Sequence, residues 1–142
     1  MSNKLLFINA HLICPEQGLD GNGWLATEGD KITAIGKGDN FSSADKNAEL
    51  IDCKGDILAP GLVDMRVKSG DPGAEHLETL SSLKEAAAHG GITSFAILPS
   101  TEPVIDTAAM IDSLHLRASR IDGPSLYCYG AITKELEDDQ MA

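Results

Sequence analysis

Three charged side chains, Asp64, Arg66 and Lys68, alternate with apolar residues over positions 62–68. In an extended strand every second side chain points to the same face, so we expect these three charges on one face. Two chemistries are open to them: an internal ion pair that involves Asp64, or an anion site formed by the two cations. We expect the ion pair, because the carboxylate lies only two residues from Arg66.

Neither cation of this segment is a metal ligand at neutral pH. The guanidinium of Arg66 has no free lone pair, and the amine of Lys68 must first lose a proton against a pKa of roughly 10. The same-face carboxylate Asp64 stands without a histidine or cysteine beside it. The segment by itself therefore predicts no metal.

The cysteines and histidines are too scattered for a zinc site or a disulfide framework. We expect Cys14, Cys53 and Cys128 to be buried, unreactive thiols in a reducing cytoplasm. We expect the histidines to be loop-packing, surface or helix-cap residues. They are His11, His76, His89 and His115.

The composition favours a single domain, or part of one, that does not bind nucleic acid. The chain has 142 residues, 42% of them hydrophobic, which is enough to form a core. Acidic residues outnumber basic ones 22 to 11, giving a net charge of −11, and the basic residues form no stripe. The N-terminus lacks an apolar run long enough for a signal peptide or a membrane span, so we expect a cytoplasmic protein without a membrane partner.

The elements that must position these residues fall into two groups. The first third alternates short β-rich runs with turn signals, which predicts a small antiparallel sheet. These runs are 5–8, 12–14, 24–27, 31–36 and 49–53.

The remainder alternates strand and helix patterns. Residues 62–68, 92–98 and 125–129 are expected strands; a helix over 78–89 ends at Gly90, and Asp106 is expected to cap a second helix. This order indicates a parallel sheet, which opens either a doubly wound fold or a (β/α)8 barrel. The absence of a glycine-rich loop after the first strand makes nucleotide binding the weaker alternative.

Several motifs resemble dihydroorotases, with allantoinases and hydantoinases as near relatives. LAPGLVDM at 58–65 resembles the entry into the first barrel strand of amidohydrolases. The other motifs are DPG at 71–73, EHLET at 75–79, AAAHGGIT at 86–93, LPSTEPVID at 98–106 and YGAITK at 129–134. The resemblance implies a small antiparallel β-sandwich over 1–56, followed over 57–142 by the first β/α units of a truncated (β/α)8 TIM barrel.

The same resemblance implies that the metal-binding and substrate-binding residues of the site are replaced in this chain. Active members hold zinc with two histidines spaced His-x-His on the first barrel strand, and here those positions carry Arg66 and Lys68. Gly70 replaces the arginine that binds the substrate carboxylate, and Ser100 replaces a substrate-binding asparagine. The remaining ligands and the acid/base aspartate come from later strands, which we expect a chain ending at Ala142 to lack. We therefore expect neither bound zinc nor a catalytic residue.

Two hypotheses for function follow. The first is a catalytically inactive dihydroorotase-like protein of pyrimidine biosynthesis with a structural role, for which the resemblance implies aspartate transcarbamoylase as a candidate partner. The second is a metal-dependent hydrolase of cyclic amide C–N bonds. We also expect self-association, because a partial barrel leaves strand edges open beside apolar side chains such as Phe95, Ile97 and Leu126.

Overall fold

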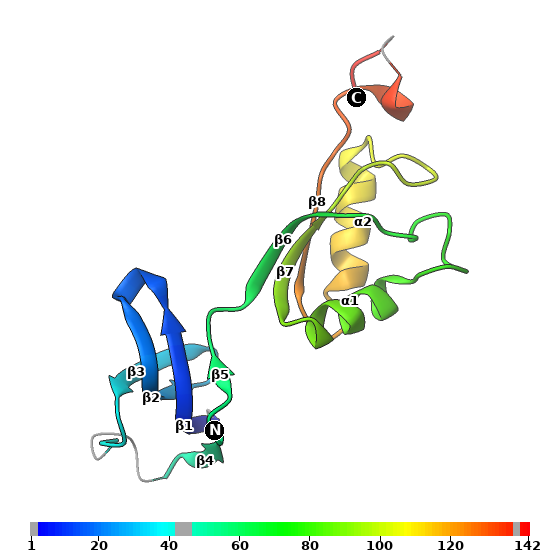
Figure 1. Cartoon of the computed structure of the whole chain (residues 1–142). Helices are drawn as coiled ribbons and strands as arrows, with labels where there is room; N and C mark the ends of the chain where they lie inside the picture. Colours follow the sequence, from blue (N-terminus) through cyan, green and yellow to red (C-terminus); the bar gives the residue numbers. More distant parts are fainter. Residues whose placement is uncertain (1–2, 42–46, 138–139) are drawn as a thin grey trace. The chain divides into compact units, whose positions relative to one another are not determined.

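The computed structural model describes residues 3–41, 47–137 and 140–142 (Figure 1). Its contacts separate the chain into two compact units, Met1–Pro60 and Gly61–Ala142. Within the described residues, no helix is both long enough and apolar enough to cross a membrane.

The first unit is a five-stranded sheet in the order β3-β2-β1-β4, with β5 also paired to β1. Its elements are β1 (Lys4–Cys14), the 3-10 turn η1 (Pro15–Gln17), β2 (Leu19–Glu28), β3 (Lys31–Lys37), β4 (Glu49–Asp52) and β5 (Ile57–Leu58). The pairs β1–β2 and β2–β3 are antiparallel, but β4 and β5 run parallel to β1. The expectation of a wholly antiparallel sheet was therefore wrong. Whether β4 runs parallel or antiparallel to β1 depends on the path of the connection before β4. The alternation of side chains along a strand is the same in both cases, so it cannot predict the direction.

Trp24 is the centre of the core of this unit. It is buried with Leu6 and Ala26. The indole lies against the backbone of Gly36, where a Cβ atom would be only 2.5 Å from the ring. Glycine at this position of β3 therefore lets the sheet close over the tryptophan.

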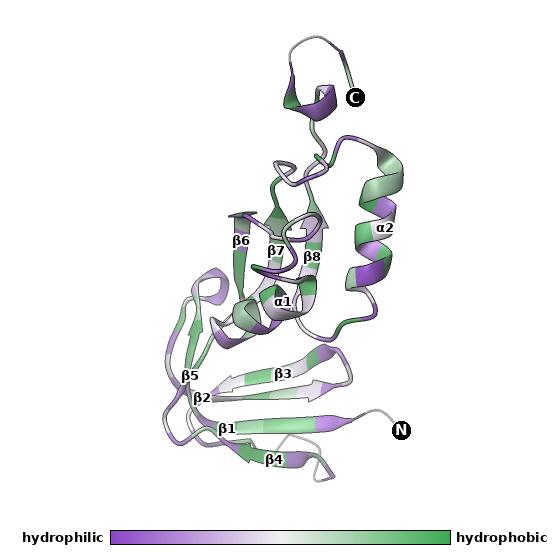
Figure 2. Cartoon of the chain, turned by 90° about the vertical axis from the view of Figure 1, so that its right-hand side faces the viewer, coloured by the Kyte–Doolittle hydropathy of each residue, from purple (hydrophilic) through white to green (hydrophobic). Residues whose placement is uncertain are grey.

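The second unit is a three-stranded parallel sheet in the order β6-β7-β8, as the strand and helix patterns predicted (Figure 2). Its elements are β6 (Leu62–Val67), α1 (Leu80–His89), β7 (Ile92–Ile97), α2 (Ala108–Ala118), β8 (Ser125–Cys128) and the 3-10 turn η2 (Lys134–Leu136). The helix α1 begins with a capping box between Thr79 and Ser82 and ends at Gly90. The expectation that Asp106 caps α2 was wrong: the helix begins at Ala108, so Thr107 is the N-cap, and its side chain accepts the N–H of Met110. The Asp106 carboxylate accepts the main-chain N–H of Glu135.

The core of the second unit lies between the sheet and its two helices. Because α1 packs on β7 and α2 on β8, Phe95, Ile97 and Leu126 are almost completely buried. The expectation that these side chains line exposed edges was wrong. Exposed apolar residues of this sheet include Leu62 and Met65 on β6, which are 61% and 59% accessible, and Tyr127 on β8, which is 56% accessible.

Candidate functional site

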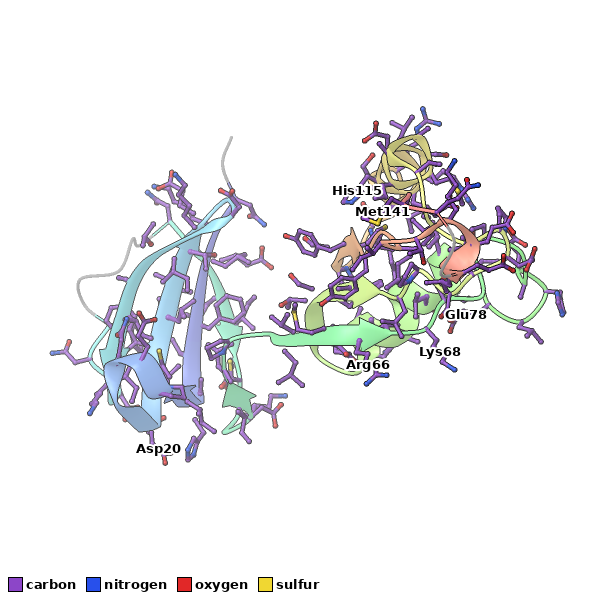
Figure 3. All side chains as sticks on the ribbon, turned by 90° about the horizontal axis from the view of Figure 1, so that it is seen from above. Asp20, Arg66, Lys68, Glu78, His115 and Met141 are labelled. Atoms are coloured by element: carbon purple, nitrogen blue, oxygen red, sulfur yellow. The ribbon has the colours of Figure 1, made fainter. Side chains whose placement is uncertain are left out.

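The candidate site lies where β6 ends and the chain passes into the loop before α1. The strand ends at Val67, so Arg66 is its penultimate residue and Lys68 is the first residue of the loop. Both side chains are exposed. Figure 3 shows them at the same end of β6. Neither forms an ion pair with any carboxylate that the structure describes.

Asp64 interacts with the backbone of its own strand. Its Oδ1 accepts the main-chain N–H of Arg66 at 2.9 Å, at an irregularity in the pairing of β6 with β7. The expected ion pair between Asp64 and the guanidinium is therefore not formed. At this irregularity the N–H of Arg66 would lack a partner in the hydrogen-bond ladder with β7, and the Asp64 carboxylate is its acceptor instead.

The two substrate-binding positions implied by the resemblance lie in successive loops. Gly70 is in the loop after β6, where its carbonyl accepts the N–H of Ala74 at 2.6 Å. Ser100 is exposed in the loop after β7. The two loops meet where Glu102 donates its main-chain N–H to the carbonyl of Pro72 at 3.3 Å.

An ion pair that sequence reasoning missed connects the first loop to α2. Arg117 donates from Nη2 to Oδ2 of Asp71 at 2.5 Å, and Asp71 is only 2% exposed. The other oxygen of Asp71 has no partner among the described atoms. The sequence indicated Asp71 only as part of the DPG motif. No sequence signal predicts an ion pair with a residue 46 positions later.

A second missed residue is Lys84, which is 4% exposed in the core of the second unit. Its ammonium group donates to the carbonyl of Ala118 at 2.9 Å and to that of Ile121 at 2.5 Å. These carbonyls lie at and just beyond the C-terminal end of α2, where the negative end of the helix dipole also stabilises a cation. The sequence did contain a signal for this burial, because Lys84 lies on the same i, i+3, i+4, i+7 face of α1 as Leu80, Leu83 and Ala87.

The donor atoms around the candidate site do not fit a divalent metal. Arg66 and Lys68 offer hydrogen-bond donors and positive charge where lone pairs are needed. His76 is exposed. Its neighbour Glu75 accepts the main-chain N–H of Gly73, which lowers the pKa of that carboxyl group. Within residues 3–41, 47–137 and 140–142, no three histidine, cysteine or acidic side chains gather in one place.

The remaining histidines belong to β1 and to the two helices. His11 is exposed, as expected for a surface residue, and its Nε2 lies 2.7 Å from Oδ1 of Asp20 across the β1–β2 pair. His89 lies in the last turn of α1, as predicted for a helix-end residue. His115 lies in the last turn of α2 and lines an open cavity of about 480 Å³ beside Lys84. None of the candidate site residues lines this cavity.

The three cysteines are free and half-buried. Their burial is only partial, whereas full burial was expected. Burial raises the pKa of Cys53, and it raises the pKa of Cys128 to about 11. Both thiols are therefore poor nucleophiles at neutral pH.

Comparison with known proteins adds relatives that share these elements. Residues 55–142 match the family model described as "Dihydro-orotase-like". The dihydroorotase of Wolbachia sp. subsp. Drosophila simulans (strain wRi) is 40% identical over 130 residues, which cover 92% of this chain and 29% of the relative. The dihydroorotase of Syntrophus aciditrophicus (strain SB) is 39% identical over 139 residues, which cover 98% of this chain and 32% of the relative. The chain thus spans about three tenths of the length of these curated relatives.

A solved structure supports the same fold. The L-hydantoinase (dihydropyrimidinase) from Arthrobacter aurescens superposes with a TM-score of 0.72 at 23% identity. The match covers 94% of this chain and 28% of the hydantoinase chain. The chain therefore has the mixed α/β arrangement found in part of that structure.

Proposed function

Because the chain belongs to the dihydro-orotase-like family, we propose that it is a catalytically inactive dihydroorotase-like protein of pyrimidine biosynthesis with a structural or assembly role. The observation that carries this proposal is the pair Arg66 and Lys68, which occupy the positions of the His-x-His metal ligands in active members. In this role the second unit supplies the first three strands of a (β/α)8 barrel. In the same proposal residues 1–56 are its N-terminal β subdomain, a boundary four residues before the end of the first unit at Pro60.

Electrostatics argues against a metal at this place. Two positive side chains at the mouth of a barrel repel a divalent cation, and the repulsion grows as the surroundings become less polar. The nearest carboxylate, Asp64, already accepts the N–H of Arg66. A metal bound by the other oxygen of Asp64 would still need further ligands, and Arg66 and Lys68 cannot supply them.

Metal analysis tests the proposal directly. We expect the purified chain to carry no stoichiometric zinc after mild dialysis, while a dihydroorotase treated in the same way serves as the positive control. About one zinc per chain, lost when Asp64 or His76 is replaced by alanine, would contradict the proposal.

A second test restores the three altered positions together, as Arg66→His, Lys68→His and Gly70→Arg. We expect metal affinity to rise, because neutral imidazole nitrogens replace cations. We expect no hydrolysis of dihydroorotate, because the bridging lysine, further histidines and acid/base aspartate of active members have no counterpart at this site. Turnover above that of a metal-free sample would show that these groups have been misplaced.

The alternative function is metal-dependent hydrolysis of a cyclic amide C–N bond. The observation that favours it is the set of relatives named dihydroorotase, about two fifths identical and roughly three times longer than the aligned region. Such an activity would need ligands supplied by residues outside the present sequence. Fusing the chain to the remaining part of the Syntrophus relative and assaying dihydroorotate hydrolysis with added zinc would distinguish the two.

For the assembly role, we propose aspartate transcarbamoylase as the partner to test. Light scattering of the chain with and without that enzyme measures complex formation. Bovine serum albumin at equal concentration controls for nonspecific attraction. Masses that equal the sum of the separate components would remove this partner from the proposal.

A further inference from the structure

The open cavity of about 480 Å³ at the end of α2 has a buried positive charge in its wall. The charge belongs to Lys84, which lines the cavity and is 4% exposed. Its ammonium group forms no ion pair with any carboxylate that the structure describes. Buried charges in proteins are usually paired, because removing an ion from water is costly. The two carbonyl groups that Lys84 binds supply dipoles but leave its charge unneutralised.

Three hydrogen-bond donors at this cavity have no partner among the described residues. An ammonium group has three N–H donors, and that of Lys84 uses two of them, on the carbonyls of Ala118 and Ile121. The main-chain N–H groups of Asp122 and Gly123, which also line the cavity, donate to no described atom. A Cβ atom on Gly123 would lie 3.6 Å from Cβ of Lys84 and 3.7 Å from its Cε. Gly123 therefore lies against the lysine side chain, and the unused donors share one place with the charge.

The size and charge of the cavity limit what it can bind. Its volume lies in the range of about 300 to 1,000 Å³ that is typical of sites for small organic molecules, so it exceeds the needs of an inorganic ion. Pro124 and Leu126 supply apolar atoms to its wall. Asp122 lines the same cavity, and its carboxylate repels a ligand with two negative charges more strongly than one with a single charge.

We propose that this cavity binds a small organic monocarboxylate. The ligand carboxylate accepts the third N–H of Lys84 and the main-chain N–H of Gly123, and its hydrocarbon part lies on Pro124 and Leu126. A hydrogen bond between two ionised groups is stronger than one between neutral groups, so the ligand supplies the missing counter-charge. The site is independent of the proposed function, because neither Arg66 nor Lys68 lines the cavity.

Calorimetric titration of the whole chain with sodium benzoate gives the first test. We expect saturable binding of one benzoate per chain. Benzamide, which has the same ring without the charge, and inorganic phosphate should each bind at least about tenfold more weakly. The net charge of −11 disfavours nonspecific attraction of these anions to the rest of the surface. No saturation by benzoate or acetate at tens of millimolar, benzamide equal to benzoate, or phosphate as tight as benzoate would each overturn the proposal.

Two pairs of variants assign the binding to the cavity. Lys84→Met should weaken benzoate binding by about tenfold or more, whereas Lys68→Met, which removes the same charge from an exposed position, should leave it unchanged. If Lys84→Met fails to fold, Asp122→Asn decides, since loss of its repulsion should tighten phosphate binding by about threefold or more. Asp112→Asn makes the same change on the exposed surface of α2, outside the cavity, and is its control. Equal affinities within either pair would contradict the assignment.

Amide chemical shifts locate the bound benzoate. We expect the largest changes at Asp122, Gly123 and Ser125, which line the cavity. Largest changes at Arg66 and Lys68 would place the anion on the exposed cations of the candidate site and would refute the proposal. Zinc content and dihydroorotate hydrolysis test the proposed function separately, so the failure of one does not imply the failure of the other.

Discussion

Replacing Lys84 by methionine should destabilise the second unit even though the substitution places an apolar side chain in an apolar core. The ammonium group of Lys84 donates to the carbonyls of Ala118 and Ile121 at 2.9 and 2.5 Å. These bonds connect α1 to the end of α2. Methionine fills a similar volume but leaves both acceptors without this donor.

The magnitude follows from two opposing contributions. Hydrogen bonds from a charged donor contribute about 1.5 to 3 kcal/mol each. In the variant the carbonyl of Ile121 loses this donor, at a cost of about 1 to 3 kcal/mol if it is left unsatisfied, whereas the carbonyl of Ala118 still accepts the main-chain N–H of Ile121 at 3.2 Å. Burying an ammonium ion in the wild type costs several kcal/mol, which the methionine variant recovers. Since Lys84 is 4% exposed but has two acceptors within hydrogen-bond distance, we expect a net loss of about 2 kcal/mol.

Urea unfolding followed by helical circular dichroism measures this loss, because both α-helices among the described residues belong to the second unit. With a typical urea m value near 2 kcal/mol/M, the midpoint should fall by about 1 M at unchanged slope. Lys68→Met removes the same charge from an exposed position and is the matched control. A Lys84→Met midpoint equal to or above that of Lys68→Met would refute the reasoning, since desolvation would then outweigh the two hydrogen bonds.

Three further predictions concern a helix cap, a thiol and the exposed strand. Thr79→Ala removes the capping box of α1 and should cost about 1 kcal/mol in the urea assay, whereas Ser81→Ala on the exposed face of the same helix should be nearly neutral. Cys128, with a pKa of about 11, should react with a thiol reagent at pH 8 far more slowly than in urea. Since its folded pKa lies above the usual 9.0, stability due to this group should also fall as the pH rises from about 9 to 11. Light scattering should show mass increasing with concentration, because Leu62 and Met65 remain 61% and 59% exposed on an edge strand.

Each of these expectations has a result that would contradict it. Equal losses for Thr79→Ala and Ser81→Ala would mean that the cap contributes little. Equal reaction rates of Cys128 in the folded and unfolded chain would mean that the thiol is not shielded. A constant monomer mass across the concentration series, with no binding of an apolar dye, would mean that the exposed face of β6 is covered within one chain.

The sequence predicted the elements whose signals lie within a few residues of one another. Alternation over 62–68 predicted the strand that the structure has at 62–67, and helical spacing over 78–89 followed by Gly90 predicted α1. The order of strands and helices then predicted the parallel sheet, which the structure confirms. The motifs predicted a relation to the dihydroorotase family, and the family comparison confirms it for residues 55–142. These signals are local because side-chain direction and helix capping depend on residues two to four positions away.

The tertiary structure decided which distant groups meet. The acceptors of Lys84 lie 34 and 37 residues further along the chain, and Asp71 lies 46 residues from Arg117. The direction of β4, the partner of His11 and the backbone packing around Gly70 are decided in the same way. The residue types at positions 66, 68 and 70 led, through the resemblance, to the prediction of an inactive site, and this stays a prediction. The contacts of the loop after β6 with α2 and with the loop after β7 depend on the path of the chain between them, and no local pattern specifies such a path.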